Sequence, residues 1–205
     1  MASVESGRLA LVMRAASQRH RGLQRKRTMD VAAAQREVRS IYLGGYFGQL
    51  VSGTLWLVSA AFATWMSQRA GIFVLVLGGF AIFPLTQLLL LVTGRPASLT
   101  DKNPLRELAI EIAFLVPLLL PLVGAATAYH GSWFYPSMMI VVGAHYLPFS
   151  FLYGMREFLI LSGSLLFAGI FFGLYAPHFA VYGCWLTGIT LCVFAFVGKS
   201  AALRS

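Results

Sequence analysis

Six hydrophobic stretches constrain this chain more than any other feature of its sequence. They lie near residues 41–66, 71–93, 105–129, 133–155, 157–177 and 179–198. Each is long enough to form a helix that crosses about 30 Å of hydrocarbon. Because a soluble domain cannot bury six such stretches and keep a wettable surface, the sequence predicts an all-α, multi-pass membrane protein with a bundle of six transmembrane helices.

Basic residues are distributed very unevenly over the connections between these stretches. If the N-terminus is cytoplasmic, all of the 16 Lys and Arg residues except Arg69 lie on the cytoplasmic side. An excess of basic residues in the inner connections sets the orientation of membrane proteins. The sequence therefore predicts that both termini are cytoplasmic, and that the longest connection, 94–104, is cytoplasmic too.

Composition indicates a single membrane domain, 41–198, between a basic N-terminal extension, 1–40, and a short tail, 199–205. Charged residues make up only 11% of the chain, against roughly 25% in soluble domains. The extension is expected to be disordered or interfacial, and one interpretation is that translation starts at Met29. The formal charge of +9 favours binding to anionic lipid headgroups, and we expect no nucleic-acid partner.

Several kinds of chemistry lack the residues that they need. Cys184 and Cys192 lie eight residues apart, roughly 12 Å along one helix, so they cannot form a disulfide with each other. The sequence contains no phosphate-binding glycine loop, no hydrolase motif and no metal-ligand spacing. We therefore expect no cofactor and no metal, and a protein that is not an enzyme. An intramembrane enzyme that acts on lipid is the third-ranked alternative.

Glu111 is the most unusual side chain, because it lies about one and a half helical turns inside the third stretch. An ionised carboxylate is costly in hydrocarbon, so it needs a partner, a hydrated cavity or a proton. We weigh a role in a substrate or proton pathway against a structural ion pair with Arg156. Glu107, four residues earlier, is interpreted as a solvated charge at the membrane boundary.

His145 lies near the middle of the fourth stretch, three residues before Pro148. Proline cannot donate the usual backbone hydrogen bond, so the carbonyl of Ala144 is expected to be free. An imidazole at this depth suits a proton relay or substrate binding, and the alternative is a hydrogen bond between helices. His145 and Arg156 fall on one helical face and are expected to border one cleft.

Polar residues from several stretches share an estimated depth of ~7–12 Å inside the cytoplasmic boundary, at about 1.5 Å rise per residue. They are Gln49, Gln87, Glu111, Ser162 and Ser164. Their common depth predicts a polar pocket that faces the cytoplasm, floored by His145 and flanked by Glu111 and Arg156. Gln49, Gln87, Glu111, His145 and Arg156 are therefore the candidates for a substrate or proton pathway.

Small residues four positions apart occur in three of the stretches, at Gly44/Gly48, Gly124/Ala128 and Gly169/Gly173. Such pairs let the backbones of two helices approach closely. We interpret them as packing sites within one protomer. The alternative is a seam between two copies of the chain in a homo-oligomer.

Four segments carry a family resemblance: Tyr42–Gly53, Phe83–Gln87, Gly94–Ser98 and Val142–Phe149. They resemble a family of small, uncharacterised, multi-pass integral membrane proteins of bacteria. The resemblance covers roughly residues 37–198 and implies a setting in the bacterial inner membrane. It implies no activity and no catalytic residue.

The leading functional hypothesis is a small transporter or permease for a small solute, with proton coupling through Glu111 and His145. The alternative is a non-catalytic membrane protein that binds or regulates a partner. In that alternative the buried polar side chains only hold the helices together. The two hypotheses differ in what they expect of a cavity, because only the first needs one that is open to a solute.

Overall fold

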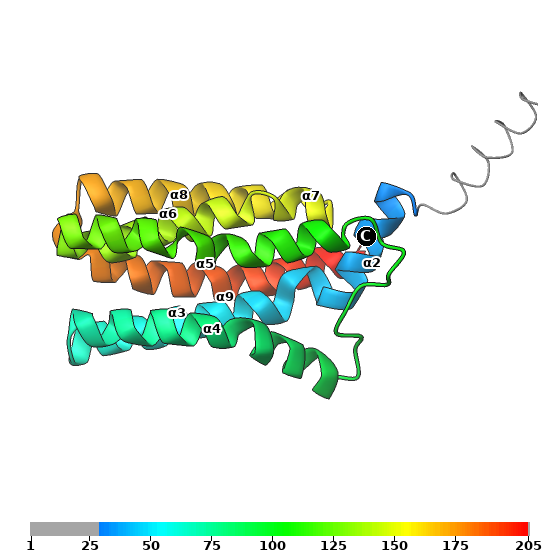
Figure 1. Cartoon of the computed structure of the whole chain (residues 1–205), viewed down its shortest axis with the longest axis horizontal. Coiled ribbons are helices and arrows are strands. Elements are labelled where there is room, and N and C mark those ends of the chain that lie inside the picture. Colours follow the sequence, from blue (N-terminus) through cyan, green and yellow to red (C-terminus); the bar gives the residue numbers. More distant parts are fainter. Residues whose placement is uncertain (1–28, 205) are drawn as a thin grey trace, which may run out of the picture.

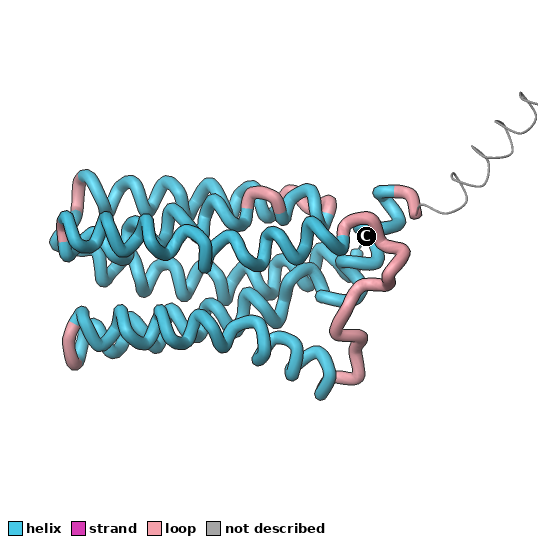
Figure 2. The backbone as a smooth tube through the Cα atoms, in the orientation of Figure 1, coloured by secondary structure: helices cyan, strands magenta, loops and turns pink. Residues whose placement is uncertain are grey.

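The structure is a computed structural model that describes residues 29–204 of the chain. The interpretations of residues 1–28 lie outside the described residues. Within 29–204 the chain is helical and contains no strand (Figure 2), which confirms the all-α prediction. The elements are α2 (Val31–Tyr42), η1 (Leu43–Gly45), α3 (Tyr46–Trp65), α4 (Gln68–Val92), α5 (Arg106–Tyr129), η2 (Gly131–Trp133), α6 (Phe134–Tyr146), α7 (Phe149–Tyr153), α8 (Glu157–Leu174), η3 (Pro177–Phe179) and α9 (Ala180–Arg204).

Several of these helices are long and apolar enough to cross a membrane. Within the described residues there are five such segments: Val31–Trp65, Gln68–Val92, Arg106–Tyr129, Glu157–Leu174 and Pro177–Arg204. The fourth predicted stretch, 133–155, is instead divided between α6 and α7. At 13 residues, α6 alone is shorter than the roughly 20 residues that a membrane crossing needs.

The division between α6 and α7 occurs at Pro148, which has no N–H to donate into the helix. The carbonyl of Ala144, expected to be free for this reason, accepts a 3.2 Å hydrogen bond from the backbone N–H of Leu147. The helix therefore tightens by one residue here instead of leaving the carbonyl unpaired. α7 then ends at Gly154, which adopts a left-handed conformation with φ of 63°.

The first predicted stretch is also interrupted, at the turn between α2 and α3. Leu43, Gly44 and Gly45 all have positive φ angles, of 50°, 62° and 82°. Three successive left-handed residues end α2 and turn the chain into α3. α2 falls mostly within the predicted N-terminal extension, yet it buries Ala34 and Val38 completely at one end of the bundle.

Close contacts between helices depend on several glycines. A Cβ at Gly53 of α3 would lie 3.0 Å from the backbone nitrogen of Cys192 in α9. A Cβ at Gly169 of α8 would lie 2.8 Å from the carbonyl oxygen of Pro136 in α6. A Cβ at Gly124 of α5, by contrast, would meet no neighbouring atom within 4 Å. The Gly169 site thus packs within the protomer, whereas the Gly124 site does not.

A buried polar network links four helices in the half of the bundle away from α2. The Ser59 hydroxyl of α3 donates to the Gly71 carbonyl of α4 at 2.8 Å and lies 3.1 Å from the Tyr135 hydroxyl of α6. The Cys184 thiol of α9 donates to the Trp56 carbonyl at 3.4 Å. Every one of these side chains is satisfied, so the network ties the helices together.

The ends of the described chain lie at the same end of the bundle, where α2 meets the last turns of α9 (Figure 1). Hydrogen bonds join the connecting segments at this end. Gln35 donates to the Phe151 carbonyl at 2.6 Å, and Arg95 donates to the Ser40 carbonyl at 2.6 Å. At the opposite end, Gln68 donates to the Gly131 carbonyl at 2.9 Å and so joins the two turns there.

Candidate functional site

A cavity of about 620 Å³ lies between the α3–α4 pair and the α5–α6 pair. Its floor, deepest in the bundle, includes Trp56 of α3, Leu75 of α4 and Met138 of α6, all of them buried. At its other end it reaches the connection between α4 and α5, where Leu99 lines it. The cavity therefore extends from the middle of the bundle to the end that carries α2.

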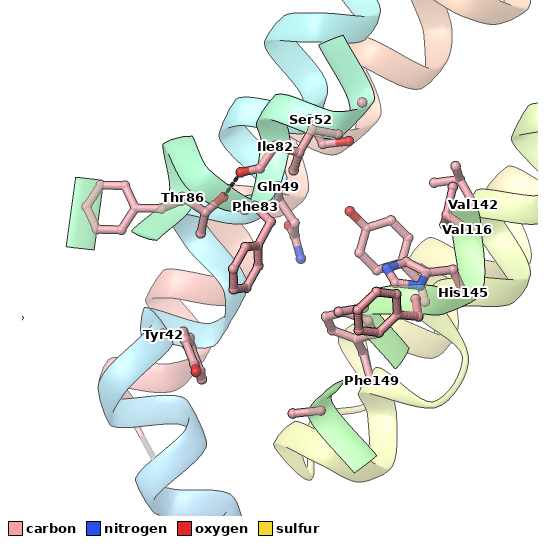
Figure 3. Close-up of a pocket in the computed structure, with 18 of the residues that line it drawn as sticks. Tyr42, Gln49, Ser52, Ile82, Phe83, Thr86, Val116, Val142, His145 and Phe149 are labelled. Atoms are coloured by element: carbon pink, nitrogen blue, oxygen red, sulfur yellow. Dashed lines mark hydrogen bonds between the residues drawn. The ribbon is translucent and has the colours of Figure 1, made fainter. Parts of the chain in front are cut away.

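Two buried polar atoms in this cavity have no hydrogen-bond partner. They are Oε1 of Gln49, a residue of α3 that is only 3% exposed, and Nδ1 of His145 in α6. Figure 3 shows the two side chains on facing walls, with the Gln49 amide directed toward the space between them. Because leaving a buried polar group unpaired costs about 1–3 kcal/mol, a hydrogen bond from a molecule in the cavity would stabilise these two atoms. The third such atom of the described residues, Oγ of Ser162, lies outside the lining.

The sequence places Gln49 on the cavity wall together with its helical neighbours. Gln49, Ser52 and Trp56 are three and four positions apart, so they lie on one face of α3, and all three line the cavity. On α4 the same spacing joins Phe83, Thr86 and Leu90. The Thr86 hydroxyl donates to the Ile82 carbonyl at 2.7 Å (Figure 3), so it is already partnered.

Aromatic rings surround His145 and hold its imidazole in place. The ring of Phe149 lies 4.9 Å from the imidazole, centroid to centroid, and that of Tyr146 lies 5.5 Å from it. Tyr153 and Phe158 extend the same cluster, with their ring centroids 4.9 Å apart. The imidazole also contacts the backbone of Ile112 in α5. Rings packed in this way make the α6–α7 wall rigid and largely apolar.

A set of hydrogen bonds around Glu37 lies beside the end of the cavity near α2. Its carboxylate accepts from the backbone N–H of Thr100 at 2.9 Å and from the side-chain amide of Asn103 at 3.0 Å. Asn103 is 4% exposed and also donates to the Ala34 carbonyl at 3.2 Å. These bonds attach the α4–α5 connection to α2, beside the mouth of the cavity.

The lining contains one charged side chain, Arg106, at the start of α5. Its guanidinium pairs with Asp101 at 2.6 Å, the one ion pair among residues 29–204. The same described range contains no group of three or more His, Cys, Asp or Glu side chains that would hold a metal ion. The cavity therefore offers an apolar surface with a few neutral hydrogen-bonding groups.

The structure brings together three of the five residues proposed from the sequence. Gln49, Gln87 and His145 all line the cavity. Glu111 and Arg156 do not line it; both are exposed, and they form no ion pair with each other. Glu111 follows the lining residues Ala109 and Ile110 along α5 but points away from the space that they border.

Other residues of the lining were not predicted from the sequence. Ser52, Thr86 and Arg106 supply polar groups, and Tyr146 and Phe149 supply most of the wall beside His145. The three- and four-residue spacing of Ser52 from Gln49 and Trp56 is the signal that identifies its face. Such spacing only becomes informative once one member of the face is known to border a cavity.

No curated protein and no solved structure matches this chain. A family of unknown function, DUF7010, matches residues 31–199, which includes all of the cavity lining. The four sequence segments predict an uncharacterised family, and the match agrees, whereas a bacterial origin and a membrane setting stay predictions. The chain belongs to the DUF7010 family.

Proposed function

We propose that this protein is a small multi-pass transporter or permease, and that the cavity between α3–α4 and α5–α6 is its solute chamber. The observation that carries the proposal is the pair of unpartnered buried atoms, Gln49 Oε1 and His145 Nδ1, on facing walls of one cavity. Groups of this kind are rare in packed interiors unless a ligand or water satisfies them. Gln87, nearer the mouth, is the third polar member of the pathway.

The proposal includes six membrane crossings, with both termini cytoplasmic, in a bacterial inner membrane. The crossings are α3, α4, α5, α6 with α7, α8 and α9. Two findings support this arrangement: the described chain ends lie at one end of the bundle, and Arg69 lies at the other end while the remaining basic residues of 29–204 do not. The cavity mouth then faces the cytoplasm, and the basic extension lies at the anionic lipid surface.

Proton coupling through Glu111 remains a separate hypothesis. Glu111 and Arg156 lie outside the cavity, so the geometry gives no support for placing either in the solute pathway. His145 is the one titratable group among the unpartnered atoms of the described residues. If transport is coupled to protons, His145 is the residue that the cavity favours for it.

The rival proposal is a membrane protein that binds or regulates a partner without moving a solute. The satisfied network of Ser59, Tyr135 and Cys184 favours it in part, because that network shows polar side chains that only join helices. The rival requires the polar groups of the cavity to be structural as well. The cavity groups differ from the network, since two of them are unpaired.

Cysteine accessibility tests the chamber. In a background without Cys184 and Cys192, both replaced by Ala, Gln87→Cys should react with a water-soluble thiol reagent from the cytoplasmic side. Gly124→Cys is the control, because Gly124 is unobstructed but lies outside the lining, so the water-soluble reagent should not reach it. Failure of Gln87→Cys to react from either side would contradict the chamber.

The same method separates transport from simple binding. Met138 lies at the deep end of the cavity, five residues into α6 from its outer end. A transporter that alternates its access should expose Met138→Cys to a membrane-impermeant reagent added outside. If Met138→Cys never reacts from outside while Gln87→Cys reacts from inside, the protein binds a molecule but does not carry it across, and the rival proposal holds.

A further inference from the structure

The cavity is open on one side, between α4 and α5. These two helices line it from opposite sides but pack hardly at all against each other, whereas α4 packs extensively on α3. Four large apolar residues that line the cavity are also exposed on the surface: Phe80 and Phe83 of α4, at 64% and 63%, and Ile110 and Phe114 of α5, at 50% and 61%. Because these residues border the cavity and also reach the surface on both helices, they mark the edge of the cavity between α4 and α5.

This α4–α5 opening, defined by Phe80, Phe83, Ile110 and Phe114, faces the bilayer in the proposed topology. The residues lie along two strongly apolar helical segments, Gln68–Val92 and Arg106–Tyr129. Figure 3 shows Phe83 on the α4 wall, facing the side that carries His145. A molecule dissolved among the lipid chains therefore reaches the cavity without passing through water.

The walls indicate that the body of such a molecule is apolar. Aromatic and aliphatic side chains from α3 to α7 make up most of the lining, and Arg106, the one charged lining residue, is already paired with Asp101. A charged solute would lose its hydration here without gaining a counter-ion, at a large cost. An apolar body gains instead from leaving water.

The two unpartnered atoms indicate that the molecule also carries a neutral polar group. Oε1 of Gln49 accepts a hydrogen bond, and Nδ1 of His145 accepts or donates according to its tautomer. A hydroxyl group donates one hydrogen bond and accepts others. It satisfies both atoms by donating to Gln49 Oε1 and accepting from His145 Nδ1, in the tautomer that carries its proton on Nδ1. An ether or a hydrocarbon cannot donate to Gln49.

We propose that the cavity binds a lipid-soluble alcohol or phenol, which enters from the bilayer through the α4–α5 opening and places its hydroxyl between Gln49 and His145. This inference rests on the proposed function, in that it takes the cavity to be a ligand chamber. It adds the chemical class of the ligand and the direction of its entry.

Quenching of Trp56 fluorescence tests the chemical class. Trp56 is 1% exposed and forms part of the cavity floor, so only a molecule inside the cavity reaches it. With Trp65, Trp133 and Trp185 replaced by Phe, the probes are 4-bromophenol and its methyl ether, 4-bromoanisole, in proteoliposomes at equal membrane concentrations. We expect bromophenol to quench at about five- to tenfold lower concentration, the effect of about one hydrogen bond.

Four variants and one lipid probe complete the experiment. Gln49→Leu should bring the two probes to equal quenching, because only the phenol donates to Oε1 of Gln49. His145→Phe should weaken quenching by both probes, because the oxygen of the phenol and that of the ether both accept from Nδ1. Gly79→Leu should weaken quenching by both probes, because Gly79 lines the cavity and a Cβ there meets no atom within 4 Å. Gly124→Leu should not, because Gly124 is equally unobstructed but lies outside the lining. Phospholipid with brominated acyl chains should quench Trp56 through the α4–α5 opening, and Gly79→Leu should remove that quenching as well.

Each result that differs from these expectations overturns a stated part of the inference. Equal quenching by phenol and ether in the unaltered cavity would exclude the hydroxyl ligand. No quenching by the brominated lipid would exclude entry from the bilayer. Quenching that Gly79→Leu leaves unchanged would place the probes outside the cavity and overturn both parts. If Gln87→Cys still reacts from the cytoplasm in these cases, the chamber stands and only the ligand class fails.

Discussion

Buried polar residues in this protein are of two kinds, and the difference is visible residue by residue. Ser59 donates to the Gly71 carbonyl and contacts the Tyr135 hydroxyl, so its burial is compensated. Gln49 is buried almost as deeply, yet its Oε1 has no partner. Removing a compensated group breaks hydrogen bonds, whereas removing an uncompensated one relieves a cost. Mutation therefore distinguishes a structural polar group from one kept for a ligand.

The first prediction compares these two residues. Ser59→Ala should lower the free energy of unfolding by about 1–3 kcal/mol, because it removes the hydrogen bonds of Ser59 to the Gly71 carbonyl and the Tyr135 hydroxyl. Gln49→Leu, similar in shape, should leave the stability unchanged or raise it. Thermal unfolding in detergent measures both. If Gln49→Leu destabilises the protein as much as Ser59→Ala does, the cavity group is structural and the partner-binding proposal gains.

The second prediction concerns glycines that are needed for close packing. Gly53→Ala should destabilise the α3–α9 contact by about 1–3 kcal/mol, because its methyl group would lie 3.0 Å from both the Cys192 nitrogen and the Gly188 oxygen. Gly124→Ala should have no such cost and should gain up to about 1 kcal/mol from helix propensity. If Gly53→Ala and Gly124→Ala lowered the melting temperature equally, the expected difference in packing between the two sites would be wrong.

The residues of the candidate site were only partly predictable from the sequence. Depth along a helix follows from the number of residues, at about 1.5 Å each, and this grouped Gln49 and Gln87 with Glu111, Ser162 and Ser164, above a deeper His145. Of these residues, Gln49, Gln87 and His145 line the cavity, whereas Ser162 and Ser164 do not. Depth says nothing about which way a side chain points around the helix axis. Glu111 has a similar depth but lies on the other face of α5, and Arg156 follows the turn at Gly154. Those directions depend on packing between helices.

At the scale of helices, the six hydrophobic stretches predicted where helices occur, but the breaks within them were not predicted. Apolar residues are equally compatible with a straight helix and a broken one. The turn at Leu43–Gly45 depends on α2 packing across the end of the bundle, and the α6–α7 break depends on Pro148. Pro84, Pro117 and Pro121 remain inside α4 and α5, so proline alone does not specify a break.

The third prediction tests how α2 holds the α4–α5 connection. Glu37→Ala removes the acceptor of hydrogen bonds from Thr100 and Asn103. Hydrogen bonds to a charged group contribute about 1.5–3 kcal/mol, so amide exchange at Thr100 should become about tenfold faster or more. Arg36→Ala is the control, since Arg36 is an exposed neighbour on the same helix. Equal exchange in both variants would show that Glu37 does not hold the connection.

At the scale of the whole molecule, the distribution of basic residues and the arrangement of the helices distinguish the same two ends of the bundle. The connections that carry Arg95, Lys102 and Arg156 gather with α2 and the end of α9 at one end of the bundle. Arg69 begins α4 at the opposite end, where Gln68 bonds to Gly131. The order of charges along the chain was enough to predict which connections share a side. The structure adds that the cavity extends to the basic end.

The last prediction tests this polarity on the intact protein. In a background without Cys184 and Cys192, single cysteines replace two exposed residues, Lys102 and His130, in connections at opposite ends. His130→Cys should react with an impermeant thiol reagent in whole cells, and Lys102→Cys only after the membrane is permeabilised. The reason is that each basic side chain costs about 2.5–3.5 kcal/mol at the membrane centre, which opposes moving the basic end outward. Reaction of Lys102→Cys in whole cells would reverse the orientation, and the mouth of the cavity would then open to the outside.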